Sequence, residues 1–368
     1  MNKKDRVMTT LEHKEPDCVP ITELAIDPPH LERITQTQHG GEASIQTAVT
    51  ADRRAEEAIN GVTVLAYRKL GFEIIPCAFS SPDGWVSSRT SDGAPVDEWG
   101  RVISYDSRSM TWVPSGSIFS APEQFDQFPF PDPHASGRTF GIEDMKKRIG
   151  DEIALAGLVK DPFACAWEIF NVTNFVRWLY ERPNFVRHVI ERIADFNVEM
   201  IKRLIDAQAD LIVCDGDYAE KMGPLVPLNF FREVILPNLR RQADVAHKAG
   251  LKFIKHTDGN INPILHDLVS IVDGLHSIDP SASMDMGDLK RRYGDKLILM
   301  GNVSTDNLCR KSKQEIEQET KECIRTAAPG GGYILSSSNS WYSDAKLENC
   351  LAMVEIGRRY GRYPIHVN

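Results

Sequence analysis

The chain has 368 residues, a net charge of −9 and a pI near 5.6, so it offers no basic surface for nucleic acid or for an anionic membrane. Its 42% hydrophobic and 26% charged residues are typical of a globular protein and exclude a disordered or fibrous chain. We therefore expect small molecules or proteins as partners, with no nucleic acid and no membrane among them.

The N-terminal segment MNKKDRVMTTLEHKEPDCVP lacks the apolar core of a signal peptide, and no later run approaches the ~20 apolar residues of a membrane span. The seven cysteines are scattered and form no CxxC pair. Reduced, mostly structural thiols are therefore expected. Together these features predict a cytoplasmic protein.

The first elements alternate between helix and strand. Residues 3–13 are expected to form a short helix, and Val19–Ile26 a first strand. Residues 51–70 carry apolar side chains at helical spacing, and Phe72–Phe79 follows as a second strand. The pattern predicts a repeating strand and helix unit.

Residues 92–113 alternate apolar and polar side chains around Asp, Gly and Ser turns. This pattern predicts a β-hairpin insertion, a small antiparallel excursion in the N-terminal third that lies outside the main repeat. Residues 122–133 are rich in proline and aromatic side chains, so we expect a packed loop there.

The second half of the chain alternates strands and helices regularly. Its clearest helix carries apolar residues on one face between Val186 and Leu204. The predicted strands are Ile153–Val159, Asp210–Cys214, Leu251–His256, Val272–Ser277, Leu297–Gly301 and Tyr333–Ser337.

With the two earlier strands the count is about eight, which predicts an α/β fold, a (β/α)8 TIM barrel, as one domain over residues 1–368. A doubly wound sheet is the alternative fold, disfavoured because no strand is followed by a glycine-rich phosphate fingerprint. Glycines 330–332 precede a strand, so we interpret them as a helix-to-strand turn at the amino end of the barrel.

The segment LKFIKHTDGN, residues 251–260, is where chemistry is most expected. In an extended chain His256 and Asp258 project to the same face, because side chains two residues apart point the same way. Gly259 then allows a sharp turn. An imidazole and a carboxylate would share one pocket at the carboxyl end of a strand, where parallel α/β folds bind ligands.

Polar side chains follow the other predicted strands as well. Asp and Asn favour loops and helix caps, and a lone His is usually structural, so each position also has a non-functional explanation. Their convergence at one end of a barrel is what an active site requires. These residues are Glu168, Asp215, Asp217, His276, Asp279, Asn302, Ser338 and Asn339.

Two interpretations of His256 with Asp258 remain open. As metal ligands they could supply two of the four that zinc needs, with Glu168, Asp217 or Asn339 completing an oxygen-rich shell. Without a metal, Asp258 could hold His256 in one tautomer so that the imidazole exchanges a proton.

The chain resembles the uroporphyrinogen decarboxylase superfamily, in particular its corrinoid-dependent methyltransferase branch. The resemblance runs over nearly the full length and implies a (β/α)8 barrel. It is carried by the segments DRVMTTLEHKEPDCVPI, VDEWGRVIS, FPFPDP, GDYAEKMGPLVPLNFFREVILP, HTDGN, LILMGNVST, PGGGYILSSSNSW and RRYGRYP.

Departures from the family pattern narrow the function. Thiol-methylating members of the resembled branch hold zinc with a His-x-Cys pair and a later Cys, and here the corresponding residues are His256, Asp258 and Asn339. Two soft ligands are replaced by oxygen groups, which disfavours a thiol acceptor. The arginine-rich motif of the decarboxylase is absent from residues 20–40, and Asn339 stands where that enzyme has a histidine.

What the resemblance then implies is an O-demethylase component, a methyltransferase moving a methyl group from a small methylated donor, such as a methoxylated aromatic, to cob(I)alamin. The chain has no DxHxxG motif, so a separate corrinoid protein must bring the cobalamin. The catalytic candidates are His256, Asp258, Glu168 and Asp217. The substrate-binding candidates are Tyr218, Trp167, Asn302, Asn339 and Trp341.

Two other functions are weighed against this one. A decarboxylase of a polycarboxylate or tetrapyrrole would need a mouth lined by Arg and Lys. A barrel that binds a tetrapyrrole or corrinoid without chemistry is the second alternative. The resemblance also allows a homodimer, since relatives of this barrel are often dimers.

Overall fold

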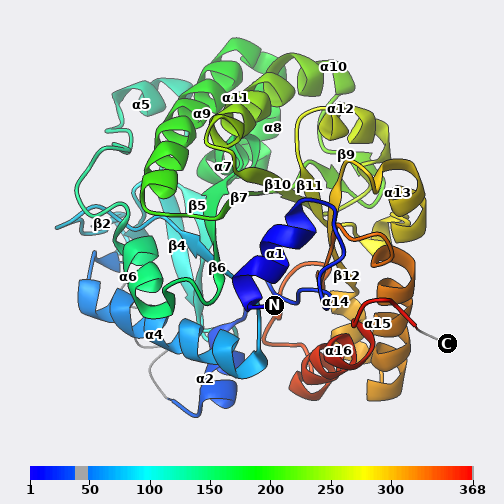
Figure 1. Ribbon diagram of the computed structural model, residues 1–368. Coiled ribbons are helices and arrows are strands. Elements are labelled where there is room, and N and C mark those ends of the chain that lie inside the picture. Colours follow the sequence, from blue (N-terminus) through cyan, green and yellow to red (C-terminus); the bar gives the residue numbers. More distant parts are fainter. Residues whose placement is uncertain (38–48, 367–368) are drawn as a thin grey trace.

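A curled sheet of seven parallel strands forms the centre of the molecule. The computed structural model describes residues 1–37 and 49–366, and the strands follow one another in the sheet in chain order (Figure 1). They are β1 (Ile74–Ala78), β6 (Ala154–Lys160), β7 (Leu211–Asp215), β10 (Lys252–Thr257), β11 (Gly274–Ser277), β12 (Ile298–Val303) and β13 (Tyr333–Ser337).

The extended segment around Ile21 closes this sheet. Thr22 N donates to Leu335 O on β13 at 3.0 Å, and on the other side Glu73 N donates to Ile21 O at 3.0 Å, just before β1. The predicted first strand, Val19–Ile26, therefore fills the eighth position through short bridges and without a continuous ladder. The predicted TIM-barrel-like α/β fold is confirmed.

Helices cover the outside of the sheet (Figure 1). The longest, α9, presents to the sheet the apolar face predicted between Val186 and Leu204. The helices are α1 (Lys3–Leu11), α2 (Pro28–Thr35), α4 (Arg53–Leu70), α5 (Pro122–Gln127), α6 (Phe140–Ile149), α7 (Pro162–Phe170), α8 (Val172–Glu181), α9 (Pro183–Asp206), α10 (Leu228–Phe230), α11 (Leu236–Lys248), α12 (Leu265–Val269), α13 (Met286–Tyr293), α14 (Thr305–Arg310), α15 (Lys313–Ala327) and α16 (Leu347–Tyr360).

The barrel interior is filled by alternate side chains of the strands, because successive residues of a strand point to opposite faces. Apolar residues fill its amino-terminal half, and polar residues take over toward the carboxyl ends. The interior apolar cluster includes Ile74, Ala154, Ala156, Leu211, Val213, Ile254, Ile298, Met300 and Ile334.

The predicted antiparallel excursion is present and longer than expected. Four strands lie in the order β2-β3-β4-β5, with β4 and β5 forming the hairpin. Their bounds are β2 (Ser88–Arg89), β3 (Pro95–Val96), β4 (Arg101–Asp106) and β5 (Thr111–Ser117), against the predicted range 92–113. A two-stranded hairpin, β8 (Ala219–Glu220) with β9 (Gly223–Pro224), follows β7.

The segment 122–133 was predicted as a loop, but its first half is the helix α5. Pro122 occupies the first helical position, and the Gln124 side chain accepts hydrogen bonds from Ser120 N at 2.7 Å and Ala121 N at 3.1 Å. These hydrogen bonds satisfy the backbone N–H groups just before the helix and stabilise its first turn. The high proline content had predicted a loop here. Phe125 is buried as part of the aromatic packing that was expected.

Glycines 330–332 lie between α15 and β13, as the predicted helix-to-strand turn requires. All three have positive φ, at 81°, 77° and 67°, a conformation that favours glycine. This turn lies at the amino end of β13, away from the mouth of the barrel.

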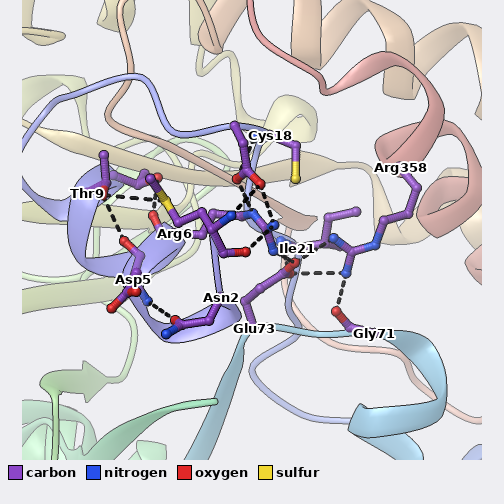
Figure 2. A network of polar contacts seen from close by, with 12 residues as sticks. Asn2, Asp5, Arg6, Thr9, Cys18, Ile21, Gly71, Glu73 and Arg358 are labelled. Carbon is purple, nitrogen blue, oxygen red and sulfur yellow. Dashed lines mark hydrogen bonds and ion pairs between the residues drawn. The ribbon is translucent and has the colours of Figure 1, made fainter. Parts of the chain in front are cut away.

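A polar network holds the amino end of the barrel together (Figure 2). Glu73, which is 1% exposed, accepts hydrogen bonds from Ile21 N at 2.8 Å, Arg6 Nη1 at 3.0 Å and Arg358 Nη1 at 2.5 Å. Arg6 also binds Asp17 through Nε at 2.8 Å. The network joins the first helix, the closing segment and the last helix.

Two expectations about the chain as a whole concern thiols and membranes. All seven cysteines lie within the described residues and are free thiols. In residues 1–37 and 49–366 no helix combines the length and apolarity required to cross a bilayer. The decarboxylase arginine motif is absent from residues 20–40, and of these, residues 38–40 lie outside the described residues.

Candidate active site

The candidate site lies at the carboxyl ends of β7, β10 and β11. His256 on β10 is paired in register with Asp215 on one side and His276 on the other, so the three side chains point into the barrel mouth. Asp217 and Asp258 follow in the turns after β7 and β10. This is the end of a parallel barrel where active sites form.

Three carboxylates surround one ring nitrogen of His256. Its Nε2 lies 3.6 Å from Asp215 Oδ1, 3.8 Å from Asp217 Oδ1 and 3.9 Å from Asp258 Oδ1. The predicted common face of His256 and Asp258 is therefore present. Gly259, at φ 83°, makes the turn that follows, and a Cβ there would collide with the backbone of Ala219.

Asp258 is held from two sides. Its Oδ2 accepts a hydrogen bond from Asn339 Nδ2 at 2.6 Å, and its backbone N donates to Asp217 Oδ1 at 2.8 Å. Its Oδ1 is buried and has no hydrogen-bond partner among the described residues. Burial raises the pKa of Asp258, His256 lowers it and Asp217 raises it further. A proton or a cation at Oδ1 would relieve this arrangement.

A hydrogen-bond chain inside the barrel fixes the tautomer of His256. Ser336 Oγ donates to Ser337 O at 2.9 Å, so it accepts from His276 Nε2 at 3.1 Å. Burial keeps the pKa of His276 well below its usual value, so this ring is neutral and its Nδ1 is an acceptor. His256 Nδ1 lies 2.7 Å from that atom and must donate to it.

With Nδ1 as the donor, His256 Nε2 either bears a lone pair or is protonated. A lone pair facing three carboxylates is repulsive unless a cation lies between them. A cation at this point, or a proton on Asp258, would reduce this repulsion.

The donor atoms fit a divalent metal ion. One ligand atom each from Asp217, His256 and Asp258 lies within 4.8 Å of the others. Nitrogen and oxygen donors of this kind suit zinc, and carboxylate oxygen also suits harder cations. The hydrogen bond from His256 Nδ1 to His276 is of the kind that orients histidines in metal sites.

Ion pairs extend the site away from His256. Lys160, at the end of β6, lies 3.4 Å from Asp215 Oδ2 and 2.8 Å from Glu168 Oε1. Glu168 also accepts from Arg101 Nη1 at 2.5 Å, and Arg101 Nε donates to Asp97 Oδ2 at 2.6 Å. Two ion pairs thus connect Glu168 to Asp215, and Asp215 in turn lies 3.6 Å from His256 Nε2.

Local structure places this ion-pair chain. Asp161 caps α7 by accepting from Phe163 N at 2.9 Å, and Pro162 at the first helical position starts the helix that carries Glu168. Asp97 Oδ1 accepts from the backbone N of Arg101 at 2.9 Å, which fixes the turn into β4.

A cavity of about 490 Å³ adjoins the ion pairs. It lies between the antiparallel sheet and the carboxyl ends of β1, β6 and β7, and Asp215 and Glu168 are part of its wall. Four aromatic side chains line it: Phe79, Trp85, Trp99 and Trp112. Its volume is within the range of pockets for small ligands, ~300–1,000 Å³.

The structure brings together four of the predicted site residues, namely Asp217, His256, Asp258 and Asn339. Glu168 lies next to this group, at the cavity. The proximity of these four residues was predicted from the sequence. Their catalytic, metal-binding and substrate-binding roles remain predictions.

The predicted substrate-binding aromatic residues lie elsewhere. Tyr218 is fully buried behind the strands, where its hydroxyl donates to Asp161 and Lys255 Nζ lies 4.2 Å from its ring centre. Trp341 is fully buried against Phe72 with ring centres 5.6 Å apart, because its backbone pairs with the closing segment. Both positions correct the expectation that these side chains line the mouth.

Trp167 and Asn302 also lie away from His256. Trp167 is half-buried on α7 and packs against the core, outside the lining of the cavity. Gly301, at φ 134°, breaks the side-chain alternation of β12, so Asn302 donates to Ile278 O at 2.8 Å and faces Cys323 on α15. The expected place of Asn302 at the mouth is therefore wrong.

Sequence reasoning missed Lys160, Arg101 and the tryptophans of the antiparallel sheet. Lys160 directly follows a predicted strand, so the rule that found His256 would have found it. Arg101 and Trp99 stand in VDEWGRVIS, which was used for the family resemblance alone. No local signal connects Trp85 or Trp112 with the mouth.

Comparisons with known proteins agree with this fold. Residues 115–360 match the family model described as uroporphyrinogen decarboxylase (URO-D). Uroporphyrinogen decarboxylase from Pseudoalteromonas atlantica is 20% identical over 260 residues, which are 67% of this chain and 71% of that protein. The enzyme from Erwinia tasmaniensis is 23% identical over 267 residues, 68% of this chain and 73% of that protein.

A solved structure titled as a methyltransferase from Methanosarcina mazei superposes with a TM-score of 0.73 at 19% identity. The alignment covers 98% of this chain and 99% of that one. At this identity the likeness shows a shared fold over the whole length.

Proposed function

This chain belongs to the uroporphyrinogen decarboxylase family, and we propose that within this family it is a methyltransferase. In the proposed reaction a methyl group passes from a small methylated donor, such as a methoxylated aromatic, to the cob(I)alamin of a separate corrinoid protein. The likeness of its fold to the structure titled as a methyltransferase supports the proposal.

The observation that carries the proposal is the set of donor atoms around His256 Nε2. All three carboxylates near it offer oxygen, and no described cysteine lies among them. Such a site suits a reaction whose leaving group is an oxygen anion. It is less suited to a reaction in which a thiol must be bound as a thiolate.

The leaving group sets the chemical demand. When the bond between the methyl carbon and oxygen breaks, both electrons stay on oxygen and a phenolate forms. A phenol has a pKa near 10, so protonating the phenolate at pH 7 is worth about 4 kcal/mol. We assign the donation of this proton to His256, oriented by His276, or to Asp258, whose pKa is raised by burial.

A divalent metal ion would be held by Asp217, His256 and Asp258. When bound, it would supply Lewis-acid stabilisation of the departing oxygen. Asn339 would orient Asp258 in that case, through the hydrogen bond to Oδ2.

A decarboxylase of polycarboxylates is the weaker alternative. Such substrates need arginine and lysine at the mouth, and the described residues there are mainly carboxylates. Lys160 and Arg101, which line the adjoining cavity, are already paired with carboxylates.

The proposal is tested with the purified protein, a reduced corrinoid protein and a panel of methoxylated aromatics, methylamines and thioethers. Loss of the cob(I)alamin absorbance with a methoxylated donor is expected, and His256→Ala should slow it at least ~100-fold while the protein stays folded. No spectral change with any donor in the panel would refute methyl transfer.

A further inference from the structure

The cavity beside His256 is positioned to bind the part of a methyl donor that carries the methyl group. It shares Asp215 with the site, and Asp215 Oδ1 lies 3.6 Å from His256 Nε2. A ligand in the cavity would therefore lie next to the group that we propose to assist the leaving oxygen. Its outer wall comes from the antiparallel sheet, through Arg101, Trp112 and Pro114.

The walls of the cavity suit an aromatic ring. Trp99 is 6% exposed and is fixed by edge-to-face contacts with Phe130 and Phe196, with ring centres 5.4 Å and 5.0 Å apart. Fixed aromatic walls bind another ring with little loss of side-chain entropy. Trp85 and Trp112 add surface from the side of the sheet.

The charges of the cavity do not suit an anion. Arg101 pairs with Asp97 and Glu168, and Lys160 pairs with Glu168 and Asp215. The two cations thus face three carboxylates. Glu98, which also lines the cavity, is neutralised separately by Arg138 at 2.6 Å. A carboxylate on the ligand would raise the number of acidic groups around the two cations to four.

Glu168 is the carboxylate that bridges both cations, with Oε1 2.8 Å from Lys160 and Oε2 2.5 Å from Arg101. Its place is where a ligand carboxylate would bind the same two side chains. Replacing Glu168 with glutamine would leave two carboxylates, Asp97 and Asp215, beside the two cations. A ligand carboxylate would then restore the number of carboxylates to three, as in the wild type.

We infer that this cavity binds the ring of an uncharged aromatic methyl donor and that Glu168 excludes donors that carry a ring carboxylate. The inference rests on the proposed function for the identity of the ligand as a methyl donor. It makes Glu168 a determinant of specificity and leaves bond breaking to the group around His256.

The test measures binding of guaiacol and of vanillate, which differ by one carboxylate, by calorimetry without any corrinoid protein. The wild type should bind guaiacol at least about tenfold more tightly, because like charges at close range oppose binding. Glu168→Gln should tighten vanillate binding about tenfold or more and so shrink the ratio.

Asp144→Asn is the matched control. Asp144 is 13% exposed against 12% for Glu168, and it pairs with Arg148 at 2.8 Å, but it lies outside the cavity lining. This variant should keep the wild-type ratio. If Glu168→Gln does not fold, as judged by its melting temperature, Asp97→Asn removes another of the three carboxylates and should shift the ratio in the same direction.

Vanillate binding as tight as guaiacol binding in the wild type would overturn the inference, as would a ratio unchanged in a folded Glu168→Gln protein or no binding of either compound. Since cobalamin takes no part in the measurement, these outcomes are separate from the methyl-transfer assay. Methyl transfer from another donor would succeed even where this binding inference fails. Conversely, the binding preference would hold even where no methyl transfer is detected.

Discussion

At the scale of single residues, the account depends on the orientation of His256. Its Nδ1 is committed to His276, which in turn is anchored by Ser336, so only Nε2 faces the carboxylates. Buried polar chains of this kind work as a unit, because removing one member leaves another unsatisfied. The sequence placed His256 and Asp258 together and His276 at the same end of the barrel, but it contained no signal for the hydrogen bond from His276 to Ser336.

Ser336→Ala tests this orientation. The substitution removes the acceptor of His276 Nε2–H, so both tautomers of His276 become accessible and His256 is no longer held with a free Nε2. Metal affinity, measured by competition with a chromophoric chelator, should fall about 10–100-fold.

Ser338→Ala is the control for that measurement. Ser338 is 5% exposed and accepts a hydrogen bond from Thr305 N at 3.3 Å, without a contact to either histidine. It should bind metal as the wild type does. Equal affinity of the wild type and the folded Ser336→Ala protein would show that the tautomer is set elsewhere.

Prediction of where individual side chains lie succeeded where strand alternation determines their direction. His256 and Asp258 follow that rule. It failed for Asn302, because Gly301 breaks the alternation, and for Tyr218, because the chain turns at Gly216 directly after β7 and carries the ring behind the strands. Such turns depend on backbone angles that a sequence pattern does not specify.

At the scale of elements, the closing segment around Ile21 completes the barrel and buries a carboxyl group. Glu23 is fully buried and accepts hydrogen bonds from Ser337 N and Ser337 Oγ, both at 2.7 Å. Burial raises the pKa of Glu23 from 4.5 to about 8, although the bonds from Ser337 act in the opposite direction. The folded protein therefore keeps a proton here that the unfolded chain releases.

Glu23→Gln should remove a pH dependence of stability. Because the folded-state pKa is the higher one, the stabilisation from this group is complete below pH 4.5 and is lost as the pH rises through about 8. As the pH rises from 4.5 to 8, the variant should gain up to about 5 kcal/mol of unfolding free energy relative to the wild type. Denaturant unfolding across the range measures it, and a constant difference would contradict the assignment.

Most elements could be predicted, since β6, β7 and β12 are mainly apolar runs whose residues are nearly all buried. The helix periodicity of α9 was equally clear. The antiparallel sheet was predicted with shorter bounds, because β2 is only two residues long and β5 continues beyond Val113 to Ser117. Helix α5 was missed because its capping by Gln124 depends on a side-chain contact.

At the scale of the whole molecule, the two ends of the barrel have different roles. The network at the amino end in Figure 2 ties the closing segment to the first and last helices through Glu73. The carboxyl end carries the carboxylates, the histidines and the cavity. In barrels of this kind the amino end serves stability and the carboxyl end serves chemistry.

Glu73→Gln separates these two roles. It leaves the half-buried guanidinium groups of Arg6 and Arg358 without their shared, fully buried carboxylate, so unfolding free energy should fall by about 3 kcal/mol. Below the melting temperature, the rate of methyl transfer per folded molecule should stay at the wild-type value.

Glu152→Gln serves as the control for the amino-end network. Glu152 is 46% exposed and pairs with Arg68 at 2.8 Å, so its loss should cost less than about 1 kcal/mol. A loss of transfer activity in folded Glu73→Gln would contradict the division between the two ends.

The most direct test of the central claim follows the methyl carbon itself. The protein is incubated with a methoxylated donor that carries carbon-13 in its methyl group and with reduced corrinoid protein, and the cobalamin is then extracted for mass spectrometry. The account predicts labelled methylcobalamin with the wild type and at most a trace with His256→Ala. Unlabelled cobalamin in the presence of a donor that binds would contradict it.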